Sequence, residues 1–158
     1  MEREHPLGAP DGVVGQLLID TRAIARTTHS IVGTSLLGVG YAFGTIDELG
    51  DGVFRKVRQE LGVTAFGVNV LVIEPGIEAR PHYHEEQDEL YFVHAGRARF
   101  ALPGEARELG PGGLCHVEST TPRQITSVGE EPLVMLVVGA KDGYVGRDGQ
   151  LADPSKLG

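Results

Sequence analysis

The sequence predicts an all-β domain of the barrel or sandwich type. Of 158 residues, 23 are Gly and 9 are Pro, a share of about one in five that is typical of a chain rich in turns. From Tyr41 onward, short apolar segments alternate with Gly, Pro, Asn or Asp at near-even spacing. Many short strands separated by turns favour a barrel or a sandwich. The length is that of one domain with a core of its own.

The expected elements follow one another in chain order. Between the first two strands we expect one short helix, because Phe54, Val57 and Leu61 recur at helical spacing with charged residues between them. Pro103 and Gly104, at the centre of residues 101–109, predict a hairpin turn. The strands expected from the apolar segments are 42–47, 64–73, 78–84, 89–94, 98–102, 114–118, 123–127 and 133–138.

Three segments are expected along the chain. Residues 1–40 carry no continuous amphipathic stripe, and we interpret them as an N-terminal extension that is disordered or weakly helical. Val39 could be read from an alternative start codon, so residues 1–38 are expected to lie outside the folded domain. Residues 41–145 form the predicted barrel, and residues 146–158 form a C-terminal tail.

Composition excludes several classes of partner. Lys and Arg number 14 against 22 Asp and Glu, a net charge of −8 without a basic run, so no nucleic acid is expected as a partner. The longest apolar stretch, 31–43, is shorter than the roughly 18 to 20 residues that a membrane helix needs, so no membrane is expected either. The single cysteine, Cys115, forms no internal disulfide and is more typical of a small buried apolar residue than of a nucleophile. A cytoplasmic location is expected.

The densest group of potential metal ligands lies between residues 81 and 89. His82 and His84 are two apart, so in an extended strand both imidazoles point to one face. Glu89 begins the next strand after a four-residue loop, which returns its carboxylate beside the histidines. Two imidazoles and one carboxylate with open positions suit Fe(II), Mn(II), Ni(II) or Zn(II). The alternative interpretation is a solvated acidic turn that contains two histidines.

The spacing Gly76, His82, His84, Glu89, Gly96 matches the first sequence motif of the cupin superfamily, and the chain resembles that family on these five positions. The resemblance implies a double-stranded β-helix of jelly-roll type, in which the histidines and the glutamate line the interior as metal ligands. Over residues 54–69, 89–93 and 136–140 the chain also resembles a group of small single-domain bacterial cupins of unassigned function.

The second cupin motif is degenerate, because Arg123 stands where the family has its fourth ligand, a histidine. Three alternatives follow. Water completes the coordination of a metal on His82, His84 and Glu89; or Arg123 pairs with Glu89 and weakens metal binding, or receives a substrate carboxylate or phosphate; or His116 serves as the fourth ligand.

Tyr91 shares a strand face with Glu89 and is predicted to offer its hydroxyl to the pocket. The alternative is a core tyrosine with its hydroxyl at the rim of the barrel. Arg123 and Tyr91 are therefore the candidate substrate-binding residues, and no catalytic residue is assigned, although Tyr91 or Glu86 could move a proton.

These observations predict a small metal-binding cupin that is a dioxygenase or an isomerase acting on a small polar or anionic molecule, the reaction class being an analogy with the family. The alternative is a non-catalytic module that binds a small ligand or a metal. A third hypothesis is a metal-free pocket in which Arg123 neutralises Glu89. The expected partners are a small-molecule ligand and a second copy of the chain, paired through strand edges as a homodimer.

Overall fold

The computed structural model describes residues 40–158. The extension expected over residues 1–40 therefore lies, apart from Gly40, outside the described residues. In this part of the chain no helix is long and apolar enough to cross a membrane.

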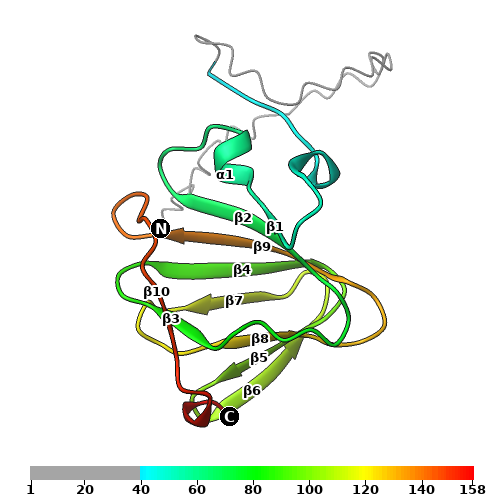
Figure 1. Ribbon diagram of the computed structural model, residues 1–158, viewed down its shortest axis with the longest axis vertical. Coiled ribbons are helices and arrows are strands. Elements are labelled where there is room, and N and C mark those ends of the chain that lie inside the picture. The colour runs from blue at the N-terminus through cyan, green and yellow to red at the C-terminus, as the bar shows by residue number, and fades with distance from the viewer. Residues whose placement is uncertain (1–39) are drawn as a thin grey trace, which may run out of the picture. The chain divides into compact units, whose positions relative to one another are not determined.

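The described residues form ten strands and three short helical segments (Figure 1). The all-β architecture is confirmed. In chain order the elements are η1 (Ile46–Leu49), β1 (Phe54–Arg55), α1 (Val57–Glu60), β2 (Gly67–Ile73), β3 (His82–His84), β4 (Asp88–Ala95), β5 (Ala98–Leu102), β6 (Glu105–Leu109), β7 (Leu114–Val117), β8 (Gln124–Ser127), β9 (Leu133–Ala140), β10 (Gly149–Leu151) and η2 (Pro154–Lys156).

The strand expected over residues 42–47 is wrong, since the 3-10 helix η1 begins within it. The Glu48 carboxylate accepts hydrogen bonds from the Thr45 backbone N–H at 2.8 Å and from Thr45 Oγ1 at 3.0 Å. This return of a glutamate to a threonine three residues earlier is a helix-start signal. Local side-chain bonds therefore close a turn where the apolar pattern alone predicted a strand.

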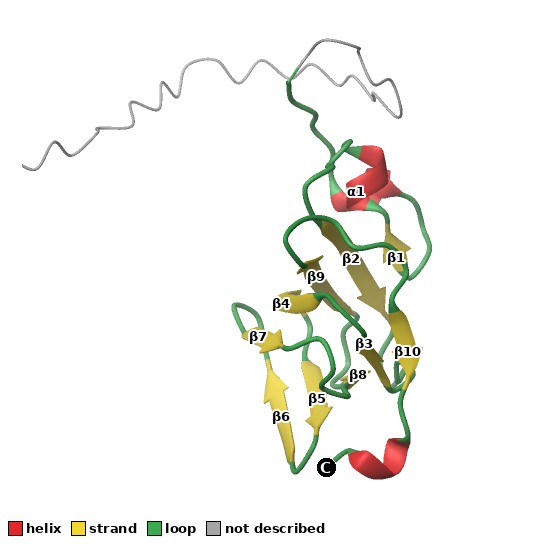
Figure 2. Cartoon of the chain, turned by 90° about the vertical axis from the view of Figure 1, so that its left-hand side faces the viewer, coloured by secondary structure: helices red, strands yellow, loops and turns green. Residues whose placement is uncertain are grey.

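The strands form three antiparallel sheets, in the orders β1-β2-β9-β4-β7, β6-β5-β8 and β10-β3. The predicted hairpin at Pro103 and Gly104 is confirmed, because β5 and β6 pair across it from Leu102 and Glu105. The view in Figure 2 shows β10 running beside β3, as their pairing of Gly149 with His84 requires. Residues 146–158, expected as a tail, thus contribute a strand.

Alternation along β4 determines which side chains reach the interior. Glu89, Tyr91 and Val93 are buried, whereas Leu90 and Phe92 on the other face are exposed. Tyr91 and Val93 pack into the hydrophobic core, whose fully buried members also include Ala98, Phe100, Ile125, Leu133 and Met135. The same two-residue period that forms this core therefore brings Glu89 and Tyr91 to the inside.

The two glycines of the first motif stand at turns that need them. Gly76 and Gly96 have φ of 76° and 69°, a region that disfavours residues with a Cβ. A Cβ at Gly96 would also collide with the carbonyl oxygen of Pro132. Gly96 therefore permits the tight connection from β4 to β5 beside the chain that enters β9.

Candidate metal site

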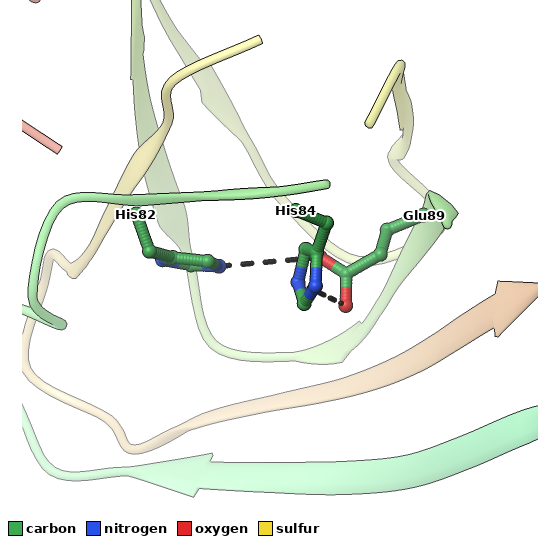
Figure 3. Close-up of side chains that lie close together, drawn as sticks. All are labelled: His82, His84 and Glu89. Atoms are coloured by element: carbon green, nitrogen blue, oxygen red, sulfur yellow. Dashed lines mark ion pairs between the residues drawn. The ribbon is translucent and has the colours of Figure 1, made fainter. Parts of the chain in front are cut away.

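Three side chains from β3 and the start of β4 point toward one another (Figure 3). His82, His84 and Glu89 each offer one ligand atom, and these atoms lie within 4.8 Å of one another. His84 Nε2 is 3.2 Å from Glu89 Oε1, and His82 Nε2 is 4.0 Å from Glu89 Oε2. His84 and Glu89 are buried, so the cluster is not a solvated turn.

The His82 imidazole is oriented by the backbone. Its Nδ1 lies 3.0 Å from the carbonyl oxygen of Arg80, to which it can donate a hydrogen bond only when Nδ1 carries the proton. Burial is the main reason that the pKa of His82 is lowered, which favours the neutral ring. A neutral ring with its proton on Nδ1 leaves the lone pair of Nε2 directed at the cluster.

The His84 imidazole is held by a carboxylate. Its Nδ1 lies 2.7 Å from Asp148 Oδ1, and Asp148 Oδ2 accepts hydrogen bonds from the backbone N–H groups of Glu86 and Gln87 at 3.1 and 3.0 Å. Burial lowers the pKa of His84, but the hydrogen bonds with Glu89 and Asp148 outweigh it and the pKa is raised. Asp148 thus fixes the ring so that Nε2 faces Glu89.

Glu89 is an ionised carboxylate with both oxygens engaged. Oε2 accepts a hydrogen bond from Arg123 Nη2 at 2.8 Å and another from the Tyr91 hydroxyl, while Oε1 faces His84. Burial raises the pKa of Glu89, but the hydrogen bonds from His84, Tyr91 and Arg123 outweigh it and hold the pKa at about 2. Arg123 and Tyr91 therefore hold Oε2, and Oε1 faces His84.

Arg123 is completely buried and lies at the centre of this network. Its Nε donates to the Tyr91 hydroxyl at 3.2 Å, and its Nη1 donates to the carbonyl oxygens of Ser119 and Thr121 at 3.1 and 2.9 Å. Of the alternatives for Arg123, the structure contains its pairing with Glu89.

Tyr91 lines the cavity in front of the cluster, whereas Arg123 is not among its lining residues in the described part of the chain. Burial and the neighbouring Glu89 raise the pKa of the Tyr91 hydroxyl, so it keeps its proton. Direct substrate contact by either residue stays a prediction.

The structure does not bring His116 to the cluster. It lies in β7 opposite Leu90, on the outward face of the sheet, with a side chain that is 58% exposed and Nε2 at 3.7 Å from Asp88 Oδ2. Strand alternation is the reason, because Val117 is the neighbour in β7 that faces inward.

Cys115 is partly buried, and burial raises the pKa of its thiol.

Asp148 is the site residue that sequence analysis missed. It precedes β10, and the pairing of β10 with β3 places it beside His84. Only three residues of β10 pair, and no apolar alternation marks them, so the sequence carries no signal for this contact. Its burial inside a segment expected as a tail depends on that long-range pairing.

The cluster opens into a cavity of about 1120 Å³. The cavity is lined by four polar side chains, those of His82, His84, Glu89 and Tyr91, and by the apolar side chains of Leu71, Ile73, Ile125 and Val137. Each of the three donors has an outer partner, namely Arg80 O, Asp148 and the pair Arg123 and Tyr91. Such outer partners are the usual support of metal ligands. The residues therefore fit a divalent cation.

Comparison with known proteins agrees with this architecture. The sequence family described as "Cupin domain" matches residues 69–139. An uncharacterised protein of Methanocaldococcus jannaschii is 25% identical over 84 residues, which are 53% of this chain and 62% of that protein. The chain thus matches about three fifths of the length of this curated relative.

Two solved structures are similar to the chain. One is a putative sugar phosphate isomerase from Acidithiobacillus ferrooxidans, with 25% identity, a TM-score of 0.51 and coverage of 54% of this chain and 56% of that one. The other is a cupin protein from Bacteroides fragilis, with 20% identity, a TM-score of 0.58 and coverage of 68% and 90%. The second similarity establishes the fold alone.

Proposed function

Because this chain belongs to the cupin superfamily, we propose that His82, His84 and Glu89 hold a divalent transition metal and that the chain is a metal-dependent isomerase of a small polar or anionic molecule. The observation that carries the proposal is the cluster of one donor atom each from His82, His84 and Glu89, within 4.8 Å of one another in the wall of a large cavity. Each of the three side chains has a hydrogen-bond partner behind it. Fe, Mn, Ni and Zn all suit this donor set.

Each residue of the cluster has a part in this proposal. A divalent cation bound there would polarise a substrate oxygen as a Lewis acid. His82 and His84 bind through Nε2, and Glu89 stays ionised because Arg123 and Tyr91 donate to its second oxygen. We propose that Arg123 and Tyr91 act on the substrate through Glu89, since both are already engaged with that carboxylate.

Isomerisation is favoured over dioxygenation by one comparison. The A. ferrooxidans structure is described as a putative sugar phosphate isomerase, and it shares 25% identity with this chain. A cavity of about 1120 Å³ is large enough for a small sugar derivative. Dioxygenase chemistry remains the second reaction class and is tested by oxygen uptake.

A non-catalytic binding module is the second candidate function. It is favoured by the state of Tyr91, whose hydroxyl already donates to Glu89 and accepts from Arg123. A hydroxyl held in this way, with a raised pKa, is a poor proton donor for a substrate. The metal-free pocket is the third, favoured by the ion pair of Arg123 with Glu89.

Metal analysis tests the site. The full-length protein is reconstituted separately with Fe(II), Mn(II), Ni(II) and Zn(II), and bound metal is measured by mass spectrometry after removal of free ions. We expect about one ion per chain for at least one metal. The double variant His82→Ala, His84→Ala should hold none. His94→Ala, His116→Ala is the matched control, because both histidines are exposed and lie outside the cluster.

The outcomes separate the candidates. Absence of stoichiometric metal in the wild type, or equal loss in the control variant, overturns the metal site and favours the metal-free pocket. If the wild type binds metal, it is incubated with a panel of sugar phosphates in heavy water, and the products are analysed by nuclear magnetic resonance to distinguish the remaining candidate functions. Incorporation of deuterium at carbon together with product formation supports an isomerase. Oxygen uptake favours a dioxygenase, and neither activity favours the binding module.

A further inference from the structure

Two arginines in the wall of the same cavity have buried N–H groups that find no hydrogen-bond partner in the part of the chain that the structure describes. Arg55 ends β1 and Arg58 lies in α1, and both line the cavity that contains the His82, His84 and Glu89 cluster. Arg55 Nε, Arg55 Nη1 and Arg58 Nε are buried and make no hydrogen bond within residues 40–158. A buried charged donor without an acceptor is costly, so such groups are expected to have a partner in the functional state.

The Arg58 guanidinium has a defined position. Its Cζ lies 3.5 Å from the centroid of the Tyr144 ring, a cation–π contact that orients the guanidinium plane over the ring. Tyr144 lines the same cavity. Stacking occupies a face of the guanidinium and leaves the N–H groups at its edge available for an acceptor.

Tyr144 connects Arg58 with the metal cluster. A Cβ placed on Gly67 would lie 3.7 Å from Tyr144 Cε2 and 3.8 Å from Gln87 Oε1, so the ring and the amide both lie over this glycine. Gln87 Nε2 is in turn 3.0 Å from His84 Nδ1. The stacked Arg58 therefore belongs to the part of the cavity wall that continues to His84.

The acidic residues of the cavity do not neutralise the two arginines. Glu89 is paired with Arg123 and Asp148 with His84. The remaining acidic residues of the wall are Asp51, Glu74 and Glu78. Within the described residues no carboxylate oxygen lies within 4.0 Å of an Arg55 or Arg58 nitrogen. The two guanidinium charges are thus available to a ligand, in a chain whose net charge is −8.

We propose that Arg55 and Arg58 form an anion subsite that binds the carboxylate or phosphate group of a small molecule occupying this cavity. Guanidinium groups bind both anions through paired N–H donors. The inference deepens the function proposed above and rests on it only for the identity of this molecule as the substrate. The anion then anchors one end of the molecule, and its polar remainder extends toward His82, His84 and Glu89.

Titration calorimetry on the metal-depleted, full-length protein tests the subsite with inorganic phosphate and with acetate, at constant ionic strength set by sodium chloride. We expect at least one anion to bind saturably to the wild type, and the anion that does so identifies the group. Arg55→Gln and Arg58→Gln should each weaken binding by about tenfold or more. Arg58→Lys, which keeps the charge and loses the paired donors, should fall between these variants and the wild type.

Arg107→Gln is the matched control. It removes the same charge from an exposed position of β6, and binding should change by less than about twofold. Absence of saturable binding of both anions, or an equal loss in Arg107→Gln, overturns the subsite.

The subsite and the metal site can fail separately. If the wild type holds no metal after reconstitution but the double variant His82→Ala, His84→Ala still binds the anion, the subsite is supported and the metal site is overturned. Stoichiometric metal in a wild type that binds neither anion does the reverse.

Discussion

Arg123 Nη2 donates a 2.8 Å hydrogen bond to Glu89 Oε2, and the two side chains are 0% and 10% exposed. Arg123 occupies the place where the cupin motif has a histidine ligand, yet here its guanidinium holds the carboxylate of another candidate ligand. The same guanidinium donates to Tyr91 and to two backbone carbonyls. The positive charge of Arg123 is therefore compatible with a metal site made of His82, His84 and Glu89, because the guanidinium orients the Glu89 carboxylate and is bonded to neither histidine.

Arg123→Gln should lower the free energy of unfolding by about 3 to 5 kcal/mol, the usual cost of removing one partner of a buried ion pair. The substitution leaves the Glu89 carboxylate without its main counter-charge and leaves the carbonyls of Ser119 and Thr121 without these donors. Urea unfolding of the metal-depleted protein measures the change. Arg97→Gln is the control, because Arg97 pairs at 4.0 Å with Glu108 on the surface. A loss of less than about 1 kcal/mol is expected there.

Stability should fall in acid because of Glu89. Its pKa in the folded chain is about 2, below the ordinary value of 4.5 for a glutamate, so the unfolded chain binds the extra proton between these values. The contribution of Glu89 to the free energy of unfolding is therefore complete above about pH 4.5 and is lost as the pH falls toward 2. It is on the order of 3 kcal/mol.

Glu89→Gln isolates this contribution. The variant lacks the titrating group, so its free energy of unfolding should change less with pH over the same interval. Both proteins are treated with a chelator, so that bound metal does not change the titration. Parallel pH profiles for the wild type and the variant would contradict the assignment.

Asp148→Asn should weaken metal binding by about 10- to 100-fold, the usual effect of altering the outer partner of a ligand. Asp148 Oδ1 lies 2.7 Å from His84 Nδ1, and the neutral amide no longer stabilises the orientation and basicity of the ring as a carboxylate does. Competition with a chromophoric chelator measures the affinity. Asp153→Asn is the control, because Asp153 is an exposed cap of η2. Similar affinities in the wild type and Asp148→Asn would show that the carboxylate does not support a ligand.

Local spacing predicted the central cluster because strand geometry is local. Residues two apart in a strand lie on the same face, so His82 and His84 could be placed together from the sequence. The short loop that follows them predicted that Glu89 returns beside them. The burial of His84 and Glu89 in one cluster agrees with that reasoning.

The partners of the cluster depend on chain segments that are distant in sequence. Asp148 reaches His84 only because β10 pairs with β3. The sequence motif showed that Arg123 stands at the position of the fourth ligand, but it could not predict whether Arg123 pairs with Glu89 or with a substrate anion. That choice is determined by Tyr91 and the carbonyls around it, which complete the donor set of the guanidinium.

The sequence also could not predict strand faces across an irregular segment of the chain. The face of His116 could not be assigned from the sequence, because a turn closed by the 3.1 Å hydrogen bond from Thr121 N to Glu118 O separates β7 from Arg123. In the structure His116 pairs with Leu90 on the outward face. Alternation is reliable within one strand and is lost where the backbone leaves the extended conformation.

A homodimer is the expected assembly, and of the strands that end a sheet we expect β7 to be the one through which two chains pair. β7 ends the five-stranded sheet, its Leu114 is 61% exposed, and Leu90 and Phe92 of the adjacent β4 are exposed on the same sheet. An apolar edge strand with free backbone groups favours pairing with another chain. Light scattering after size exclusion should give about twice the 16.9 kDa of one chain.

Leu114→Lys should shift the protein toward the mass of one chain, since a charge on an edge strand opposes pairing. Metal content should not change, because Leu114 lies outside the cluster. Leu151→Lys is the matched control: Leu151 is 69% exposed on β10, away from the five-stranded sheet, and its substitution should leave the mass unchanged. A wild-type mass of 16.9 kDa at all concentrations would contradict the dimer, and an equal shift in both variants would contradict the assignment of the edge.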